Sequence, residues 1–168
     1  MREHLTHIQR HEQDWEAQFH SSLFQSEVSV IAYDLDISTE QAEVAVLAFN
    51  HLDEHVIASL CQFSWDYCIS FCEYVGDVEA PSIQEPLEIL KYIKPTALIV
   101  EHLPEQTEPI VHVELECDWE VEHGLEWLVR GQQILYVGSF DGVNSLENES
   151  YYQNYSLNFA YGNTYDNL

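Results

Sequence analysis

Hydrophobic and polar residues alternate in several stretches of the chain, and such alternation is typical of β-strands. β-Branched and aromatic residues in the same stretches favour the same structure. Strands are predicted over 15–19, 27–33, 97–100, 110–117, 125–129 and 133–137. Arg130 and Gly131 predict a tight hairpin between the last two strands, because glycine readily adopts the positive φ that such turns need.

Apolar positions in the middle of the chain recur at helical spacing instead. Residues 38–41 have the form of a capping box, and the apolar positions after them predict a helix that begins there. Asp53 is expected to cap a second helix that ends at Gly76. Residues 87–93 predict a short helix of two turns, which Pro95 is expected to stop.

The order of these elements predicts an α+β fold, in which two to three helices pack on one face of an antiparallel sheet. Residues 1–13 form a polar, His-rich N-terminal segment, and 14–142 are expected to form a single α+β domain. Residues 143–168 are rich in Asn, Tyr and Ser, which favours a C-terminal appendage. An additional edge strand around 156–160 is the alternative for that segment.

The cysteines predict reduced thiols in the core. They are Cys61, Cys68, Cys72 and Cys117. None has CxxC spacing, and three of them share an apolar helical stripe, where a free cysteine behaves as a small hydrophobe. A metal or redox role is the alternative.

Charge narrows the possible partners. Thirty Asp and Glu residues stand against five Lys and Arg residues, which gives a net charge of -25 with the nine His neutral. Such a surface repels nucleic acid and anionic membranes and attracts basic proteins. The N-terminus lacks an apolar signal segment, and no apolar run is long enough to span a bilayer, so we expect a cytoplasmic protein.

The most specific motif spans 117–125, with the pattern C-x-W-[DE]-x-E-H-G-L. It resembles the signature of an uncharacterised bacterial domain family of small acidic proteins that often accompany polymorphic-toxin systems. The resemblance extends over about 14–142. It implies an immunity-type role and assigns no activity to single residues.

The residues of this motif allow two interpretations. If the segment is extended, Asp118, Glu120 and Glu122 project from one face, and with His123 they could hold a divalent cation. The alternative is a structured turn between strands, in which the carboxylates accept loop N–H groups or pair with the histidine.

In the second interpretation, Trp119 packs into the core and Gly124 relieves the backbone. We favour this structural turn, because carboxylates are abundant throughout the chain and their proximity alone is weak evidence for a metal.

Two histidine patterns are weaker metal candidates. His51 and His55 fit the H-x-x-E-H pattern of inverted zinc peptidases, but Asp53 is expected to separate them into two helices. The other set would share one face if the N-terminal segment were helical: His4, His7 and His11. A solvated terminus is the simpler interpretation of that set.

These observations favour a binding domain over an enzyme, without a cofactor. We expect an immunity-type inhibitor that binds a basic effector, such as a toxin nuclease, and blocks its substrate groove with carboxylates. The alternative is a metal-binding protein or metal-dependent enzyme that uses 118–123. The candidate contact residues are Glu101, Glu105 and Glu108 in the loop 101–109, together with Asp118, Glu120 and Glu122.

Overall fold

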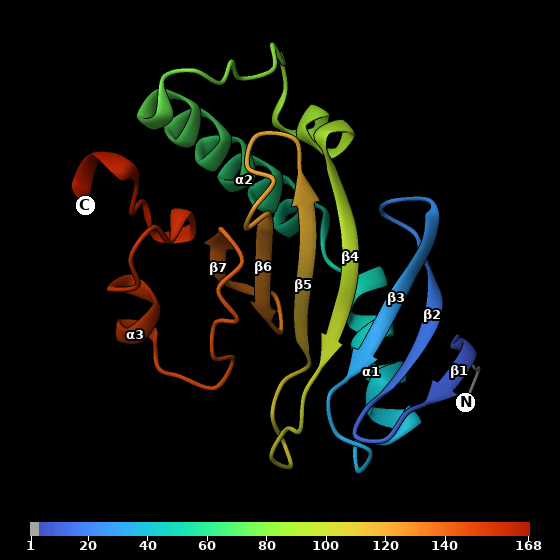
Figure 1. Ribbon diagram of the computed structural model, residues 1–168. Coiled ribbons are helices and arrows are strands. Elements are labelled where there is room, and N and C mark those ends of the chain that lie inside the picture. Colours follow the sequence, from blue (N-terminus) through green and yellow to red (C-terminus); the bar gives the residue numbers. More distant parts are fainter. Residues whose placement is uncertain (1–3) are drawn as a thin grey trace.

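The computed structural model describes residues 4–168, and its centre is one seven-stranded sheet (Figure 1). The strands lie side by side in chain order: β1 Thr6–Arg10, β2 Trp15–Ser21, β3 Ser26–Ala32, β4 Ile93–Val100, β5 Ile110–Cys117, β6 Leu125–Arg130 and β7 Gln133–Gly138. Neighbours are antiparallel except β3 and β4, which are parallel. The predicted α+β class is confirmed, with one parallel pair that the sequence did not predict.

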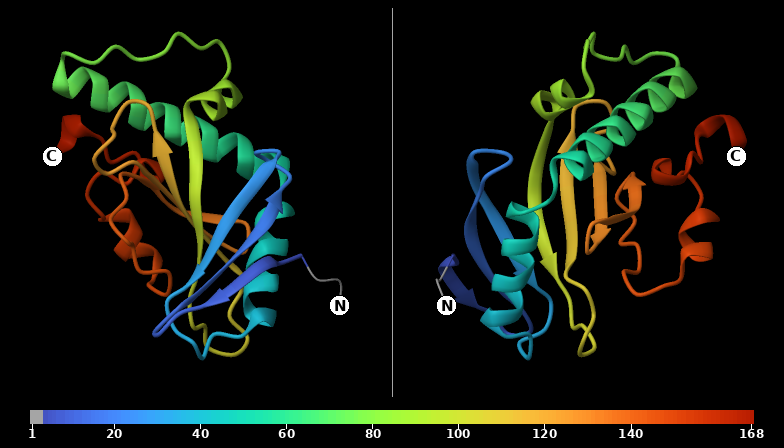
Figure 2. Two further views of the ribbon diagram at one scale, coloured as in Figure 1. Left: turned by 45° about the vertical axis from the view of Figure 1, so that its right-hand side comes forward. Right: turned by 180° about the vertical axis from the view of Figure 1, so that it is seen from behind.

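The helices form the connection between the two parallel strands. Helix α1 (Thr39–Asn50) begins at the predicted capping box, where the Gln41 N–H donates to Ser38 Oγ over 3.2 Å and the Ser38 N–H donates to Gln41 Oε1 over 2.8 Å. Helix α2 (Glu54–Val75) ends at Gly76 as predicted. Both helices cover the same face of the sheet (Figure 2). A parallel pair needs such a long crossover, because a tight turn cannot reverse the chain direction twice.

Two details around the helices differ from the prediction. The third helix is a 3₁₀ helix, η1 (Pro86–Tyr92), and β4 begins directly after it. Pro95 therefore lies inside β4, at an irregularity in the pairing with β5, and does not stop the helix. Proline is tolerated at such irregularities, because no ladder hydrogen bond is needed there. Asp53 occupies the N-cap of α2 but makes no side-chain cap hydrogen bond.

The main core lies between the sheet and the two helices. Strand β2 contributes Trp15, Ala17 and Phe19, at alternate positions as the pattern predicted. All four cysteines are free and buried, which confirms the prediction for their thiols. Burial raises the pKa of Cys61 to about 12, so this thiol stays protonated and unreactive at neutral pH.

The N-terminal segment adds strand β1 at the edge of the sheet. Every side chain of this strand is exposed, so its sequence shows no hydrophobic alternation, and the strand was not predicted. His7 lies inside this extended segment, so it does not share a helical face with His4 and His11. His4 instead contacts Glu43 of α1 through Nδ1 at 2.8 Å.

The C-terminal segment forms short helices beside β7: α3 (Glu149–Gln153), η2 (Phe159–Tyr161) and η3 (Tyr165–Asn167) (Figure 1). The strand considered around 156–160 is not formed. Tyr152 packs in a second core cluster on the sheet face opposite α1 and α2, while Phe159 joins the main core. Within residues 4–168, no helix has the length and apolar character needed to cross a membrane.

Asn158 fastens this segment to β7. Its side chain is fully buried, and Oδ1 accepts the N–H groups of Val137 and Ala160, each over 3.2 Å. Its Nδ2 donates to the carbonyl oxygens of Leu135 and Tyr152 over 2.8 and 2.9 Å. One amide therefore joins the edge strand, α3 and η2.

We predict that Asn158→Ala lowers the free energy of unfolding by about 1–3 kcal/mol, because buried backbone groups lose their partners. Urea denaturation measures the change. Asn154→Ala is the matched control, since the Asn154 amide is exposed and donates only to Ser150. Equal effects of the two substitutions would contradict the fastening role.

Candidate functional site

The motif at 118–124 forms the turn between β5 and β6, and the Glu120 carboxylate organises it. It accepts the N–H groups of Glu122 over 2.8 Å and of His123 over 3.2 Å. The His123 ring nitrogen Nδ1 contacts the same carboxylate at 2.7 Å. Glu120 is only 8% exposed. Its oxygens are therefore occupied by hydrogen bonds inside the turn. There the carboxylate serves as the acceptor for backbone N–H groups that have no partner on a neighbouring strand.

Trp119 anchors the same turn to the core. Its side chain is 4% exposed and meets the ring of Tyr67 edge to face, with centroids 5.5 Å apart. The Tyr67 hydroxyl donates to the Gly124 carbonyl over 3.0 Å, so α2 holds both ends of the turn. Gly124 has a φ of 68°, and a Cβ there would lie 2.4 Å from the Leu115 carbonyl oxygen. These contacts agree with the structural interpretation of the motif.

The remaining side chains of the motif are exposed, namely Asp118, Val121, Glu122 and His123. Between residues 4 and 168, no group of three or more His, Cys, Asp or Glu side chains is placed to hold a metal ion. His51 ends α1 and His55 lies in α2, separated by the cap residue Asp53 as predicted. The geometry thus gives the metal hypothesis no support.

The predicted contact residues fall into two groups at opposite ends of the sheet (Figure 1). Glu105 and Glu108 are exposed in the loop that joins β4 to β5, whereas Asp118 and Glu122 lie beyond the other end of β5. The eight residues of β5 separate the groups by roughly 25 Å. A small partner surface therefore contacts one group and not both.

Glu101 belongs to neither group, because its carboxylate is engaged inside the protein. Oε1 contacts His112 Nδ1 at 2.6 Å, and Oε2 accepts the Ser145 hydroxyl over 2.6 Å. The other ring nitrogen of His112 contacts Glu126, whose side chain is 0% exposed. A histidine thus bridges two carboxylates on the sheet face opposite α1 and α2.

Glu126 also holds the chain that follows β7. Its two oxygens accept the backbone N–H groups of Asp141, Gly142 and Val143 over 2.8, 3.1 and 2.9 Å. The buried carboxylate therefore has four donors, which offset the cost of removing its charge from water. The sequence did not reveal this network. His112 and Glu126 lie at the polar positions of strands in which polar and apolar residues alternate, and such positions are expected to face solvent.

The network sets the protonation of its members. Burial alone lowers the pKa of His112, but the hydrogen bonds and charges of Glu101 and Glu126 outweigh it and raise the pKa to about 9. Burial alone would raise the pKa of Glu101, and the hydrogen bonds from His112 and Ser145 bring it below its usual range. At neutral pH, a cationic His112 therefore lies between two carboxylates.

A family model described as a domain of unknown function (DUF6985) matches residues 4–144. The chain belongs to this family. The match includes all seven strands of the sheet, β1 among them, and the turn at 118–124. Searches of curated proteins and of solved structures gave no match. The immunity association and the signature that the resemblance suggested remain predictions for this DUF6985 domain.

Trp119→Ala should lower the free energy of unfolding by about 3–5 kcal/mol, because it removes a large buried ring and its contact with Tyr67. Thermal melting measures the loss. Val121→Ala in the same turn is the control, since Val121 is 87% exposed. An unchanged melting temperature for Trp119→Ala would show that the ring does not anchor the turn.

The raised pKa of His112 predicts a pH-dependent stability. Its contribution is complete below the unfolded-state pKa of 6.5 and is lost as the pH rises through about 9. Urea unfolding of the wild type and of His112→Gln between pH 6 and 9 measures it. The substitution should cost about 3–5 kcal/mol at pH 6, because it leaves two carboxylates without their cation, and should flatten the decline. An equally steep decline in the variant would refute the assignment.

Proposed function

We propose that this domain is an acidic protein-binding module, an immunity-type inhibitor of a basic effector such as a toxin nuclease. The single observation that carries the proposal is that the negative charge is uncompensated at the surface. Every ion pair in the described part of the chain has histidine as its basic member, and no Lys or Arg pairs with a carboxylate. Most of the negative charge, a net 25 with every His counted as neutral, therefore acts on the surroundings.

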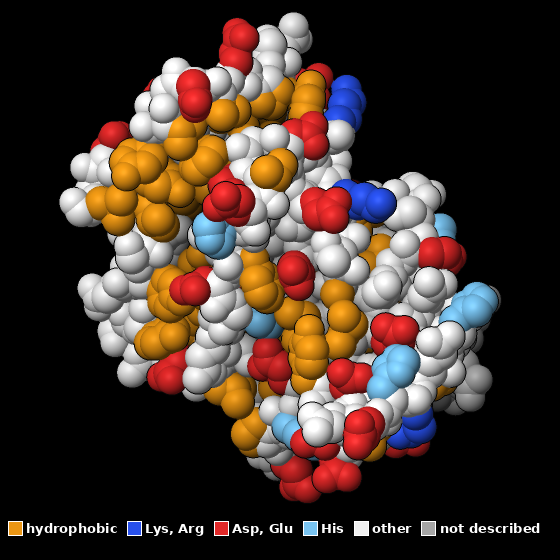
Figure 3. All heavy atoms as spheres, in the orientation of Figure 1, with side chains coloured by type: hydrophobic (Ala, Val, Ile, Leu, Met, Phe, Trp, Pro, Cys, Tyr) orange, Lys and Arg blue, Asp and Glu red, His pale blue; other side chains and the backbone are white. Residues whose placement is uncertain are grey.

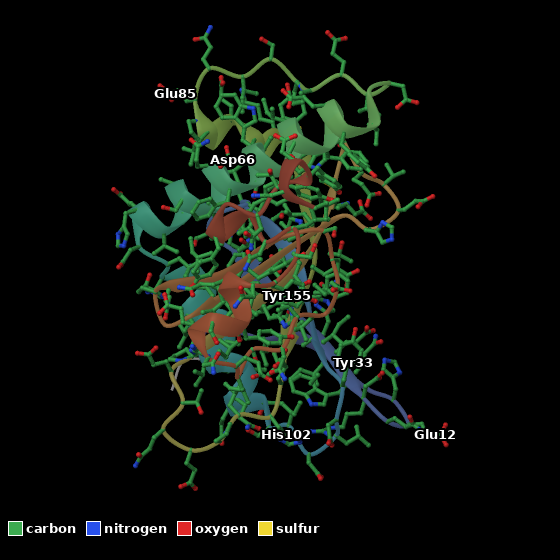
Figure 4. The ribbon with its side chains drawn as sticks, turned by 90° about the vertical axis from the view of Figure 1, so that its left-hand side faces the viewer. Glu12, Tyr33, Asp66, Glu85, His102 and Tyr155 are labelled. Atoms are coloured by element: carbon green, nitrogen blue, oxygen red, sulfur yellow. The ribbon has the colours of Figure 1, made fainter. Side chains whose placement is uncertain are left out.

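The distribution of the acids supports a long-range role for this charge. Exposed acids lie toward opposite ends of the molecule, for example Glu12 at one end and Asp66 and Glu85 at the other (Figure 4). Such a surface accelerates the encounter with a basic protein from many directions. Its carboxylates would occupy a groove that the effector uses for phosphates, and thereby block the substrate.

The turn at 118–124 is the better of the two predicted contact regions. Its exposed carboxylates, Asp118 and Glu122, stand on a turn that Trp119 and Glu120 hold rigid. Glu105 and Glu108 lie in the loop between β4 and β5, where the recorded anchors are at the two ends of the loop, at Glu101 and Pro109, and not at these acids. A rigid contact surface loses less conformational entropy on binding than a mobile one, so we place the contact at the turn.

The test is to express this chain together with a toxic basic effector encoded beside it and then to measure the binding rates of the purified pair. Survival of the cells is expected. The association rate should fall at least about tenfold between about 0.05 and 0.5 M salt, while the dissociation rate changes much less. A salt-insensitive association rate would mean that the acidity serves solubility and not recognition.

The double variant Asp118→Asn with Glu122→Gln should speed dissociation several-fold. The control is Glu105→Gln with Glu108→Gln, which removes the same charge at the far end of the sheet. It should leave the dissociation rate nearly unchanged. Both pairs are exposed, so neither should affect folding. Equal effects on dissociation would displace the contact from the turn.

A further inference from the structure

The turn at 118–124 separates two hollows of different chemistry. The first, about 720 Å³, opens toward η1 and the ends of β4 and β5, and Lys91 and Lys94 are in its lining. The second, about 570 Å³, lies between the turn and the C-terminal segment, and neither Lys nor Arg lines it. Five acids stand beside the lysines in the first hollow, so acids outnumber basic residues in both linings, but Tyr92 is the one Phe, Tyr or Trp side chain of the first. The second hollow, called here the aromatic hollow, differs by its several rings and by a lining of described residues without Lys or Arg.

Aromatic rings from three separate parts of the chain line the aromatic hollow. They are the buried Tyr136 of β7 and four more exposed rings: Phe71 of α2, Phe140 after β7, and Tyr155 and Tyr165 of the C-terminal segment. These four are partly exposed, and hydrophobic side chains gather over this part of the surface with acidic and histidine side chains at the border (Figure 3). Tyr74, which is 63% exposed, extends the surface by stacking on Tyr165 at 4.6 Å. Exposed rings on so charged a chain indicate an interaction surface.

Carboxylates stand at the rim of the same hollow. Glu122 and Asp141 line it and are exposed, while Glu120 lines it with its oxygens occupied in the turn. The Tyr155 hydroxyl donates to one oxygen of Asp141 and thereby fixes that carboxylate beside a ring. Figure 4 shows Tyr155 on the face formed by the C-terminal segment. The hollow thus combines ring faces with oriented acceptors and excess negative charge.

We propose that the aromatic hollow binds an arginine side chain of the basic partner; this rests on the proposed function and names its contact. A planar guanidinium stacks on a ring while it donates to carboxylates at its edge, and it loses less hydration than an ammonium does. Lysine offers a compact, strongly hydrated charge that gains little from the rings. Arginine is therefore selected over lysine by the rings, and cations are selected over anions by the acids.

The test uses two probes of equal charge, nona-arginine and nona-lysine peptides, titrated into the whole chain by calorimetry at about 0.15 M salt. The native chain should bind the arginine peptide about five- to tenfold more tightly than the lysine peptide. Phe140→Leu with Tyr165→Leu keeps apolar packing but removes two ring faces, and this variant should lose most of the preference while retaining its lysine affinity. Its melting curve verifies folding.

Glu122→Gln should weaken the binding of the arginine peptide more than that of the lysine peptide. Glu105→Gln, which removes the same charge from the distant loop, should weaken both slightly and equally. Equal affinities of the native chain for both peptides, or equal effects of the two charge removals, would overturn the arginine site. An arginine preference without inhibition of the effector would refute the proposed function alone, and effector binding without the preference would refute this site alone.

Discussion

The buried carboxylate of Glu126 is the constraint on which the second face of the sheet depends. A charge with no exposed surface needs several donors, and Glu126 finds them in His112 and in three consecutive backbone N–H groups after β7. The hydrogen bonds that these N–H groups donate to Glu126 fix the path of the chain beyond the last strand. The segment up to Ser145 is then held a second time, through Glu101.

That path decides what the C-terminal segment can build. Once residues 141–143 are bound to Glu126, Tyr152 enters the second core cluster and Asn158 joins the segment to β7. Phe140 and Tyr155 then face the turn at 118–124 and complete the aromatic hollow. The internal network and the external surface are therefore coupled, since loss of the first would displace one wall of the second.

The surface acids and the hydrophobic core have opposite effects on folding. Repulsion among uncompensated carboxylates opposes folding, and the protein offsets it with a continuous core that includes all four cysteines and three buried tryptophans, Trp15, Trp119 and Trp127. In the proposed function, the negative surface acts at long range and the rigid turn at 118–124 makes the contact, so encounter and specificity would depend on different residues.

The sequence by itself determined the elements whose signals are local. The alternation in β5 gave its boundaries, the capping box gave the start of α1, and Gly76 gave the end of α2, because each depends on neighbouring residues alone. Trp119 and Gly124 could also be placed in a turn. Strand β1 was not predicted, because an exposed edge strand buries no side chain and shows no hydrophobic pattern.

Only the tertiary structure decided the parallel pairing of β3 with β4, the separation of the acidic groups by β5, and the role of Glu101. It also turned two apparently solvent-facing residues, His112 and Glu126, into a buried network. The physical reason is that each of these depends on which distant segment covers a given face. Local periodicity encodes which side of a strand is polar, but not whether a later part of the chain will cover it.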